Sequence, residues 1–110
     1  MADRADKRDR KAALTAWKAR QRAAARAAFP VPPEQLSALF DWLDGEVPRR
    51  GCDHTLRLVQ EWCRQVGVDA GSVEAWLHEN GGCCDCEALA NAEEAFEEAC
   101  REPGERSPDA

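Results

Sequence analysis

Several residue types and patterns are missing from this 110-residue chain. It contains no Tyr and no Ile, and no run of about 18 apolar residues that could cross a bilayer. No stretch alternates apolar and polar residues in the Val-, Ile- and Thr-rich manner of a β-strand. The charged opening MADRADKRDR lacks the apolar segment of a secretory signal. We therefore expect an all-helical protein, without a membrane span, in the cytoplasm, where thiols stay reduced.

The usual catalytic motifs are also missing. The chain has no Gly-rich phosphate loop, no Ser-His-Asp set and no H-E-x-x-H pattern. Its acidic residues fall on exposed helix faces or at expected helix caps, which does not favour a pair of catalytic carboxylates. No residue is therefore predicted to be catalytic, and the sequence favours a non-enzymatic protein.

Charge is divided unevenly along the chain. Residues 1–29 carry nine Lys/Arg and three Asp, a balance of +6, whereas residues 30–110 carry six Arg and eighteen Asp/Glu, a balance of −12. The first stretch is Ala-rich and predicts a basic helical arm that contacts an unknown macromolecule, a nucleic acid or the ribosome among them. The ordinary alternative is that the arm is solvated or packs on its own acidic body. The candidate nucleic-acid contacts form one stripe of this helix: Arg8, Lys11, Lys18, Arg22 and Arg26.

Prolines at 30, 32 and 33 end the arm, and residues 30–101 are expected to form a small bundle of four short helices. These begin near Pro33, Asp53, Asp69 and Asp85, with Asp as the expected N-cap of the last three. Their apolar faces predict the core: Leu36, Leu39, Phe40, Leu43, Val47, Leu56, Val59, Cys63, Val66, Val73, Trp76, Leu77, Leu89, Ala92, Phe96 and Ala99. Residues 102–110 are polar and contain Pro and Gly, which predicts a disordered tail.

Six cysteines stand out against this background. Two triplets share one pattern: Cys52-Asp53-His54 and Cys84-Asp85-Cys86 each follow a glycine-containing stretch and precede an amphipathic helix. Three thiols and one imidazole make a Cys₃His set, a common structural zinc complement. Because a bundle of this size often needs a staple, we expect Cys52, His54, Cys84 and Cys86 to bind a metal, most simply zinc. The alternative is that both Asp residues are plain caps and the cysteines are small buried hydrophobes.

Residues around the two triplets could support such a site without binding the metal. Asp53 and Asp85 are expected to cap helices, and Glu87 and Arg57 could lie next to the ligands. Arg57 can equally pair with Asp53 across one helical turn. Cys63, on an apolar face, is expected in the core, and Cys100 is expected to be a free thiol at a helix end.

Two other functions use the same thiols. Cys84 and Cys86, with His54 near, could form a thiol redox centre or sensor, although a C-x-C pair closes a tight disulfide ring and no thioredoxin-like βαβ pattern is present. An exposed C-x-C could also store or deliver Cu(I) or Zn²⁺. Metal content, thiol reactivity and the rate of metal exchange distinguish these functions.

Longer motifs carry a family resemblance. The stretches LFDWLDGEV, CDHTLRL, AWLHENGG and CDCEALAN resemble a family of small bacterial proteins, the domain-of-unknown-function family 2695, over about Leu36 to Asn91. The family pattern G-C-D-H-T-L-R followed by G-G-x-C-D-C-E is matched here. The position of Cys83 is commonly aromatic in that pattern, so the resemblance implies that Cys83 is not a required ligand. The family brings no known activity.

Overall fold

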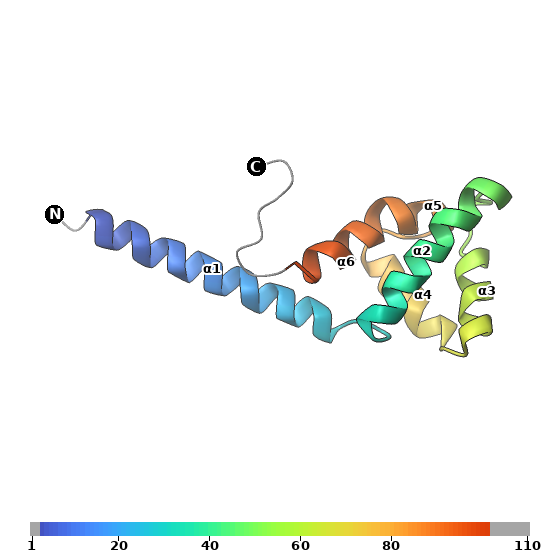
Figure 1. Cartoon of the computed structure of the whole chain (residues 1–110), viewed down its shortest axis with the longest axis horizontal. Coiled ribbons are helices and arrows are strands. Elements are labelled where there is room, and N and C mark those ends of the chain that lie inside the picture. Colours follow the sequence, from blue (N-terminus) through green and yellow to red (C-terminus); the bar gives the residue numbers. More distant parts are fainter. Residues whose placement is uncertain (1–2, 102–110) are drawn as a thin grey trace.

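The computed structural model describes residues 3–101, with side chains from residue 6 onward. Within this range the chain is helical and contains no strand, as the sequence predicts. A long helix, α1 (Asp3–Ala27), leads into a bundle built from α2 (Pro33–Arg50), α3 (Arg57–Val66), α4 (Ala70–Glu79) and a composite last helix (Figure 1). The predicted tail, residues 102–110, lies outside the described residues. None of the described helices combines the length and the hydrophobicity that a bilayer crossing needs.

The last helix changes its winding along its length. It begins as α5 (Asp85–Glu87), continues as the π-helical segment η1 (Ala88–Ala92) and ends as α6 (Glu93–Ala99). The added residue per turn lies where the chain passes Gly82, at which a Cβ would come within 3.1 Å of the Ala88 Cα. π-helical segments of this kind often lie next to functional sites.

The helix boundaries agree with the sequence except at α2 and α3. Helix α2 continues through Pro48 to Arg50, because a proline in the last turn removes only one backbone hydrogen bond. Helix α3 begins at Arg57, four residues later than expected, so Cys52 and His54 lie in a loop. The predicted cap of α4 is confirmed, since the Asp69 carboxylate accepts a hydrogen bond of 2.9 Å from the Ser72 N–H.

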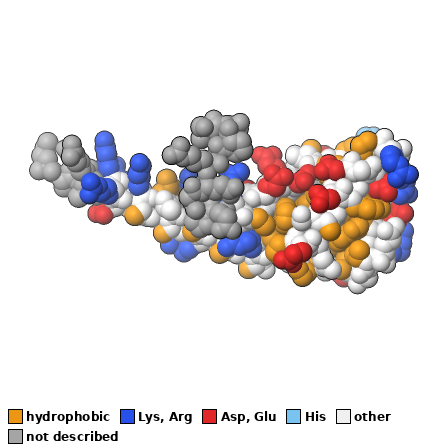
Figure 2. All heavy atoms as spheres, viewed as in Figure 1, with side chains coloured by type: hydrophobic (Ala, Val, Ile, Leu, Met, Phe, Trp, Pro, Cys, Tyr) orange, Lys and Arg blue, Asp and Glu red, His pale blue; other side chains and the backbone are white. Residues whose placement is uncertain are grey.

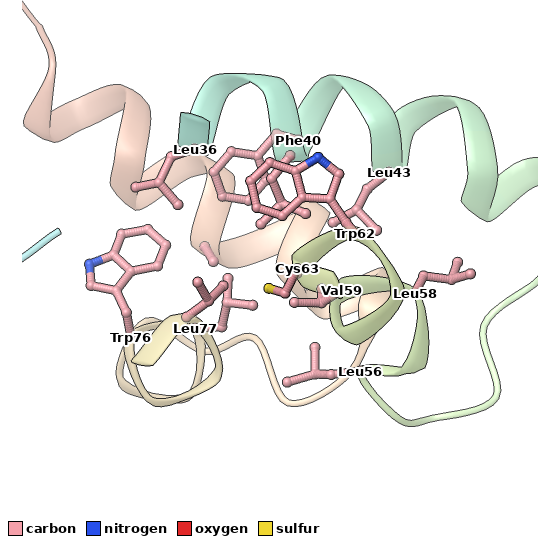
Figure 3. Packing of buried hydrophobic residues seen from close by; sticks show 14 residues of the cluster. Leu36, Phe40, Leu43, Leu56, Leu58, Val59, Trp62, Cys63, Trp76 and Leu77 are labelled. Carbon is pink, nitrogen blue, oxygen red and sulfur yellow. The ribbon is translucent and has the colours of Figure 1, made fainter. Parts of the chain in front are cut away.

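The hydrophobic core fills the space enclosed by α2, α3, α4 and η1 (Figure 3). One face of α2 supplies four buried residues, and α3 and α4 meet it with Trp62 and Trp76. Val66 departs from the prediction and is 45% exposed at the end of α3. The fully enclosed members include Leu36, Leu39, Leu43, Leu58, Val59, Val73, Leu77, Ala88 and Ala92. Burial of this continuous apolar set is the main force that holds the bundle together.

The arm lies beside the bundle and extends past it. Helix α1 packs its C-terminal half on α6, and its N-terminal half projects away, so the described molecule is 62 Å long and 26 Å wide (Figure 1). Basic side chains are strung along the projecting half, and acidic side chains gather on the body (Figure 2). The packing of the C-terminal half of α1 on α6 agrees with the expectation that the arm meets its own acidic body.

Candidate functional site

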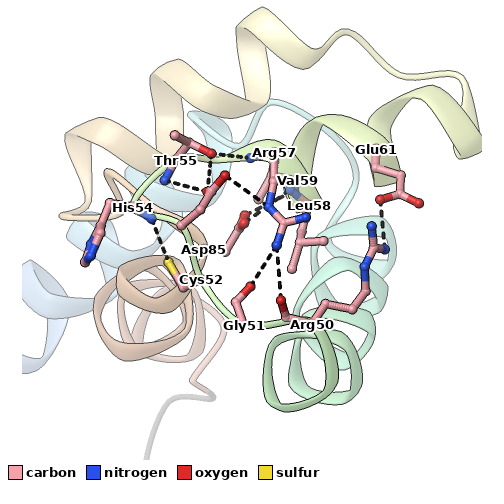
Figure 4. Close-up of polar contacts among 11 residues, drawn as sticks. Arg50, Gly51, Cys52, His54, Thr55, Arg57, Leu58, Val59, Glu61 and Asp85 are labelled. Carbon is pink, nitrogen blue, oxygen red and sulfur yellow. Dashed lines mark hydrogen bonds and ion pairs between the residues drawn. The ribbon is translucent and has the colours of Figure 1, made fainter.

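The loop between α2 and α3 carries the first cysteine triplet. Gly51 ends α2 with a positive φ of 74°, and its N–H donates to the Val47 carbonyl at 2.8 Å. Arg57 then reaches back, and its Nη2 donates to the carbonyls of Arg50 at 3.2 Å and Gly51 at 3.1 Å (Figure 4). These bonds satisfy carbonyls at the C-terminus of α2 and fix the start of the loop.

Asp53 does not cap α3, contrary to the prediction. Its carboxylate accepts hydrogen bonds from the Thr55 N–H at 3.1 Å and from the Thr55 hydroxyl, which closes a local turn. The Arg57 Nε lies 3.2 Å from Asp53 Oδ2, an ion pair without the alignment of a hydrogen bond. The hydrogen bonds from Thr55, together with the Arg57 charge, hold the pKa of Asp53 below its ordinary value.

Asp85 caps the neighbouring helix and not its own, which also corrects the prediction. It is the first residue of α5, and its fully buried carboxylate accepts from the N–H of Leu58 and of Val59, each at 3.2 Å (Figure 4). Its own N–H donates to the Thr55 carbonyl at 3.0 Å. Burial raises the pKa of Asp85, and the two N–H bonds oppose that shift. Asp85 therefore joins the second cysteine segment to the first at the N-terminus of α3.

This connection brings three thiols together from segments about thirty residues apart. Cys52 Sγ accepts from the His54 N–H at 3.4 Å, and Cys84 and Cys86 lie close enough to Cys52 to shift its pKa. A hydrogen bond from the Cys86 N–H is the main cause that lowers the pKa of Cys52. Burial raises the pKa of Cys84, and hydrogen bonding to Cys52 raises that of Cys86. Cys52 is thus the sulfur on which the surroundings favour negative charge.

The fourth predicted ligand, His54, meets the cluster through its backbone. His54 has a φ of 68°, a left-handed conformation that only a few per cent of non-glycine residues adopt. Its backbone N–H meets Cys52, and no dashed contact reaches its imidazole (Figure 4). Across residues 3–101, no three His, Cys, Asp or Glu side chains stand in the arrangement that holds a metal ion. The three thiols are therefore neighbours, and their arrangement in the described residues is not that of a preformed metal site.

The remaining cysteines take separate places. Cys83 is exposed, and its N–H donates to Glu87 Oε1 at 3.2 Å, so Glu87 stabilises the turn before α5. Cys63 lies in the core as predicted, and burial raises its pKa to about 11. Cys100 ends α6, where burial raises its pKa as well. None of these three belongs to the cluster.

Two asparagines that the sequence reasoning passed over hold the turn before the second triplet. The Asn80 amide donates to the Trp76 carbonyl at 2.8 Å, and the Asn91 amide donates to the Gly81 carbonyl at 2.9 Å. Gly81 has a φ of 83°, which explains the glycine. The N-G-G signal marks the turn, but nothing in the sequence indicates that Asn91, ten residues later, fastens it.

The arm's predicted nucleic-acid residues divide into two groups. Arg22 forms an ion pair with Glu98 at 3.0 Å, and Arg26 Nη1 donates to the Ala99 carbonyl at 2.7 Å. Arg8 and Lys11 are exposed on the projecting part of α1, and Lys18 is exposed at the edge of a pocket between α1 and α6 that Glu98 also lines. Two of the five predicted residues thus hold the arm on α6.

Comparison with known proteins supports the sequence resemblance. A family model described as "Protein of unknown function (DUF2695)" matches residues 39–91, which include both cysteine triplets. Two relatives are each 34% identical to this chain over 88 residues. They are the "Uncharacterized protein Mb2294" of Mycobacterium bovis and the "Uncharacterized protein Rv2271" of Mycobacterium tuberculosis. That alignment covers 80% of this chain and 89% of each relative. The chain belongs to this family. No solved structure matches it.

The family's G-C-D-H-T-L-R motif can now be divided by what each residue does in this member of DUF2695. Gly51, Asp53, Thr55 and Arg57 shape the loop and the ends of α2 and α3 through the bonds described above. Leu56 is buried in the core. The imidazole of His54 has no such role, and its backbone is held in an uncommon conformation.

Proposed function

We propose that this protein is a small non-enzymatic helical module that binds one zinc ion through Cys52, Cys84 and Cys86, with His54 as the fourth ligand. The observation that carries the proposal is the meeting of three thiols from two distant segments, held in place by the buried Asp85. Thiolate sulfur and imidazole nitrogen are the ligands that zinc prefers, and Cys₃His is a usual complement.

Electrostatics support the same assignment. Hydrogen bonding to Cys52 and burial raise the pKa of Cys86, and repulsion from the charges of Cys52 and Cys84 adds to the shift. A divalent cation removes that repulsion and stabilises all three thiolates at once. Binding would also require the His54 ring to turn toward the sulfurs, and its position two residues after Cys52 places it within reach of such a rotation.

The test is metal content under reducing, oxygen-free conditions. Native mass spectrometry and elemental analysis of the full chain are expected to give one zinc per molecule. Cys86→Ser, which changes an exposed cluster thiol, is expected to lose that zinc, and Cys83→Ser, which changes the exposed neighbour outside the cluster, is expected to keep it. Circular dichroism separates loss of metal from loss of fold. Less than a tenth of an equivalent of zinc in wild type after zinc addition, with the fold intact, contradicts the proposal.

A thiol redox centre is the second candidate, and the mutual pKa shifts of the neighbouring thiols Cys52, Cys84 and Cys86 favour it. Here a Cys52–Cys84 or Cys52–Cys86 bond forms, and two protons and two electrons pass to hydrogen peroxide, which becomes two waters. The geometry supports Cys52 as one partner, whereas a Cys84–Cys86 pair would close the tighter ring. Peroxide that lowers the mass by two hydrogens in the metal-free protein, reversed by dithiothreitol, identifies this function.

The rate at which the bound metal ion exchanges distinguishes a soft-metal handling protein from one with a structural metal site. A structural zinc is expected to leave only as the bundle unfolds, because metal binding and folding are coupled. A delivery site releases its ion to a chelator within seconds while the helical signal is unchanged. Cu(I) that displaces zinc at one equivalent supports delivery through the exposed Cys86.

A further inference from the structure

The projecting half of α1 is separate from the half that packs on the body. On the packed side, Arg22 and Arg26 are engaged with α6, and Phe29 lies between the rings of Trp76 and Phe96. These contacts fix the direction in which the helix leaves the bundle. The cations that come before Arg22 are therefore held at a fixed place but are not used for docking.

The projecting half carries six exposed cations. Among the side chains that the structure describes, none of them forms a salt bridge, and Arg10 donates only to the backbone carbonyl of Asp6. The segment from Lys7 to Arg20 contains one carboxylate, Asp9, and no carboxylate occurs from residue 10 to residue 27. The six are Lys7, Arg8, Arg10, Lys11, Lys18 and Arg20.

We propose that this surface, the α1 segment from Lys7 to Arg20, binds the sugar–phosphate backbone of a nucleic acid. Nucleic acids offer one negative charge per about 3.4 Å along each strand. The segment from Lys7 to Lys18 rises about 16 Å at 1.5 Å per residue, so it can follow about five phosphates of one strand. The spacing of the cations along α1 therefore matches the spacing of the phosphates along one strand.

The distribution of the cations around the helix favours a polyanion over a protein partner. At about 100° per residue, Arg8, Lys11 and Lys18 lie on one side, whereas Arg10 and Arg20 lie on others. A helix in a nucleic-acid groove has phosphates on both flanks and can use such a distribution. Only two large apolar residues, Leu14 and Trp17, each 51% exposed, lie on this part of the helix. Two residues give too little apolar area for a stable protein interface of standard size.

The acidic body does not cancel this surface. Charges in 0.15 M salt are screened over about 8 Å, so the carboxylates of the bundle act only weakly on the cations near the N-terminus of α1. Lys18 is nearer to the bundle, since it lines a pocket that Glu98 also lines. The nearest carboxylate on α6, Glu98, is already paired with Arg22 at 3.0 Å and with Arg101 at 2.6 Å. The net charge of −6 is therefore a property of the whole chain and not of the arm.

The test is fluorescence anisotropy with the full-length protein, a labelled 20-base-pair DNA duplex and an RNA hairpin, from 50 to 200 mM KCl. Lys11→Gln/Lys18→Gln is compared with Arg49→Gln/Arg64→Gln, which removes the same charge from exposed positions on the body. The arm pair is expected to bind about tenfold or more weakly, with the slope of log affinity against log salt smaller by about 2. The body pair is expected to match wild type.

The outcomes separate cleanly. Equal binding to both probes assigns the contact to the phosphate backbone, and tighter binding to the hairpin assigns it to A-form RNA. The proposal is overturned if both variant pairs lose affinity equally, or if wild-type affinity does not fall with salt. It is also overturned if the arm pair alters only the sedimentation of the protein, which makes a second copy the partner. Zinc content is measured in the same samples, so a failure of the metal proposal is seen independently.

Discussion

Asp53 and Asp85 occupy the same place in the two cysteine triplets, yet they do different things. Asp53 is exposed and closes a turn with Thr55, and Asp85 is buried and binds two N–H groups at the start of α3. The helix that follows Asp53 thus takes its cap from the other triplet. This exchange makes the geometry of the thiol cluster depend on a single buried carboxylate.

Replacing that carboxylate is the first prediction. Asp85→Asn keeps the shape but offers only one acceptor oxygen, so either Leu58 or Val59 is left with a buried, unpaired N–H. We expect a loss of about 2–3 kcal/mol in the free energy of unfolding, measured by urea denaturation. Asp53→Asn is the matched control in the equivalent position and is expected to lose less, because its turn is open to water. Equal losses in the two variants would contradict the assignment of Asp85 as the shared cap.

For single residues, the sequence indicates which positions contribute to the two cysteine segments. It does not indicate which partner each side chain binds. The repeated Cys-Asp-X triplet predicts that Cys52, Cys84 and Cys86 share a site, and in the structure the three thiols are near enough to shift one another's pKa. It could not indicate that Asp85 caps α3, because a side chain's partner across two segments depends on how these segments pack. The same holds for Asn91, whose bond to Gly81 spans ten residues. Metal binding itself stays a prediction.

Some features of the helices follow from the local sequence pattern, and others depend on how the helices pack. The spacing of Leu36, Leu39, Phe40 and Leu43 predicts the buried face of α2, since a helix repeats every 3.6 residues. The π-helical winding of η1 could not be predicted, because it depends on the close approach of Gly82 to Ala88. The late start of α3 has both a local and a distant cause: Asp53 bonds to Thr55 within the loop, and Asp85 from the second triplet caps the helix at Leu58 and Val59.

Helices α2 and α6 also bring like charges together, which yields a pH-dependent prediction. Burial raises the pKa of Glu93, and repulsion from Asp44, Glu97 and Asp41 adds to it. A raised folded-state pKa contributes stability that is fully present below the ordinary value of 4.5 and is lost as pH rises through the folded value. Glu93→Gln is therefore expected to match wild type at about pH 4 and to be more stable at neutral pH, by less than about 1 kcal/mol.

Urea unfolding followed by tryptophan fluorescence at both pH values measures this difference. Glu94→Gln is the control, because it removes the same charge from an exposed position in the same turn. A gain in Glu93→Gln that is the same at both pH values would show that repulsion between α2 and α6 is not its cause.

At the scale of the whole molecule, the composition of the arm predicts that it is helical, but its periodicity does not predict the direction in which it leaves the bundle. Its basic, Ala-rich sequence predicts a helix, and the prolines after it predict a break. Its direction follows from Phe29, whose ring centroid lies 5.8 Å from that of Trp76 and 5.5 Å from that of Phe96. Trp76 lies 47 residues after Phe29 in the sequence, and Phe96 lies 67 residues after it. No local pattern contains that information.

Phe29 therefore offers a way to release the arm without changing its charge. Phe29→Ala is expected to lower the free energy of unfolding by about 2 kcal/mol, below the cost for a fully buried Phe because this ring is only partly buried. Trypsin is expected to cut at Arg22 and Arg26 several times faster, since their contacts with α6 require the helix to stay docked. Leu14→Ala, in the projecting half, is the control and is expected to change stability by less than about 0.5 kcal/mol. If both variants are cut at the wild-type rate, the arm is held by the Arg22–Glu98 ion pair and the Arg26 hydrogen bond and not by Phe29.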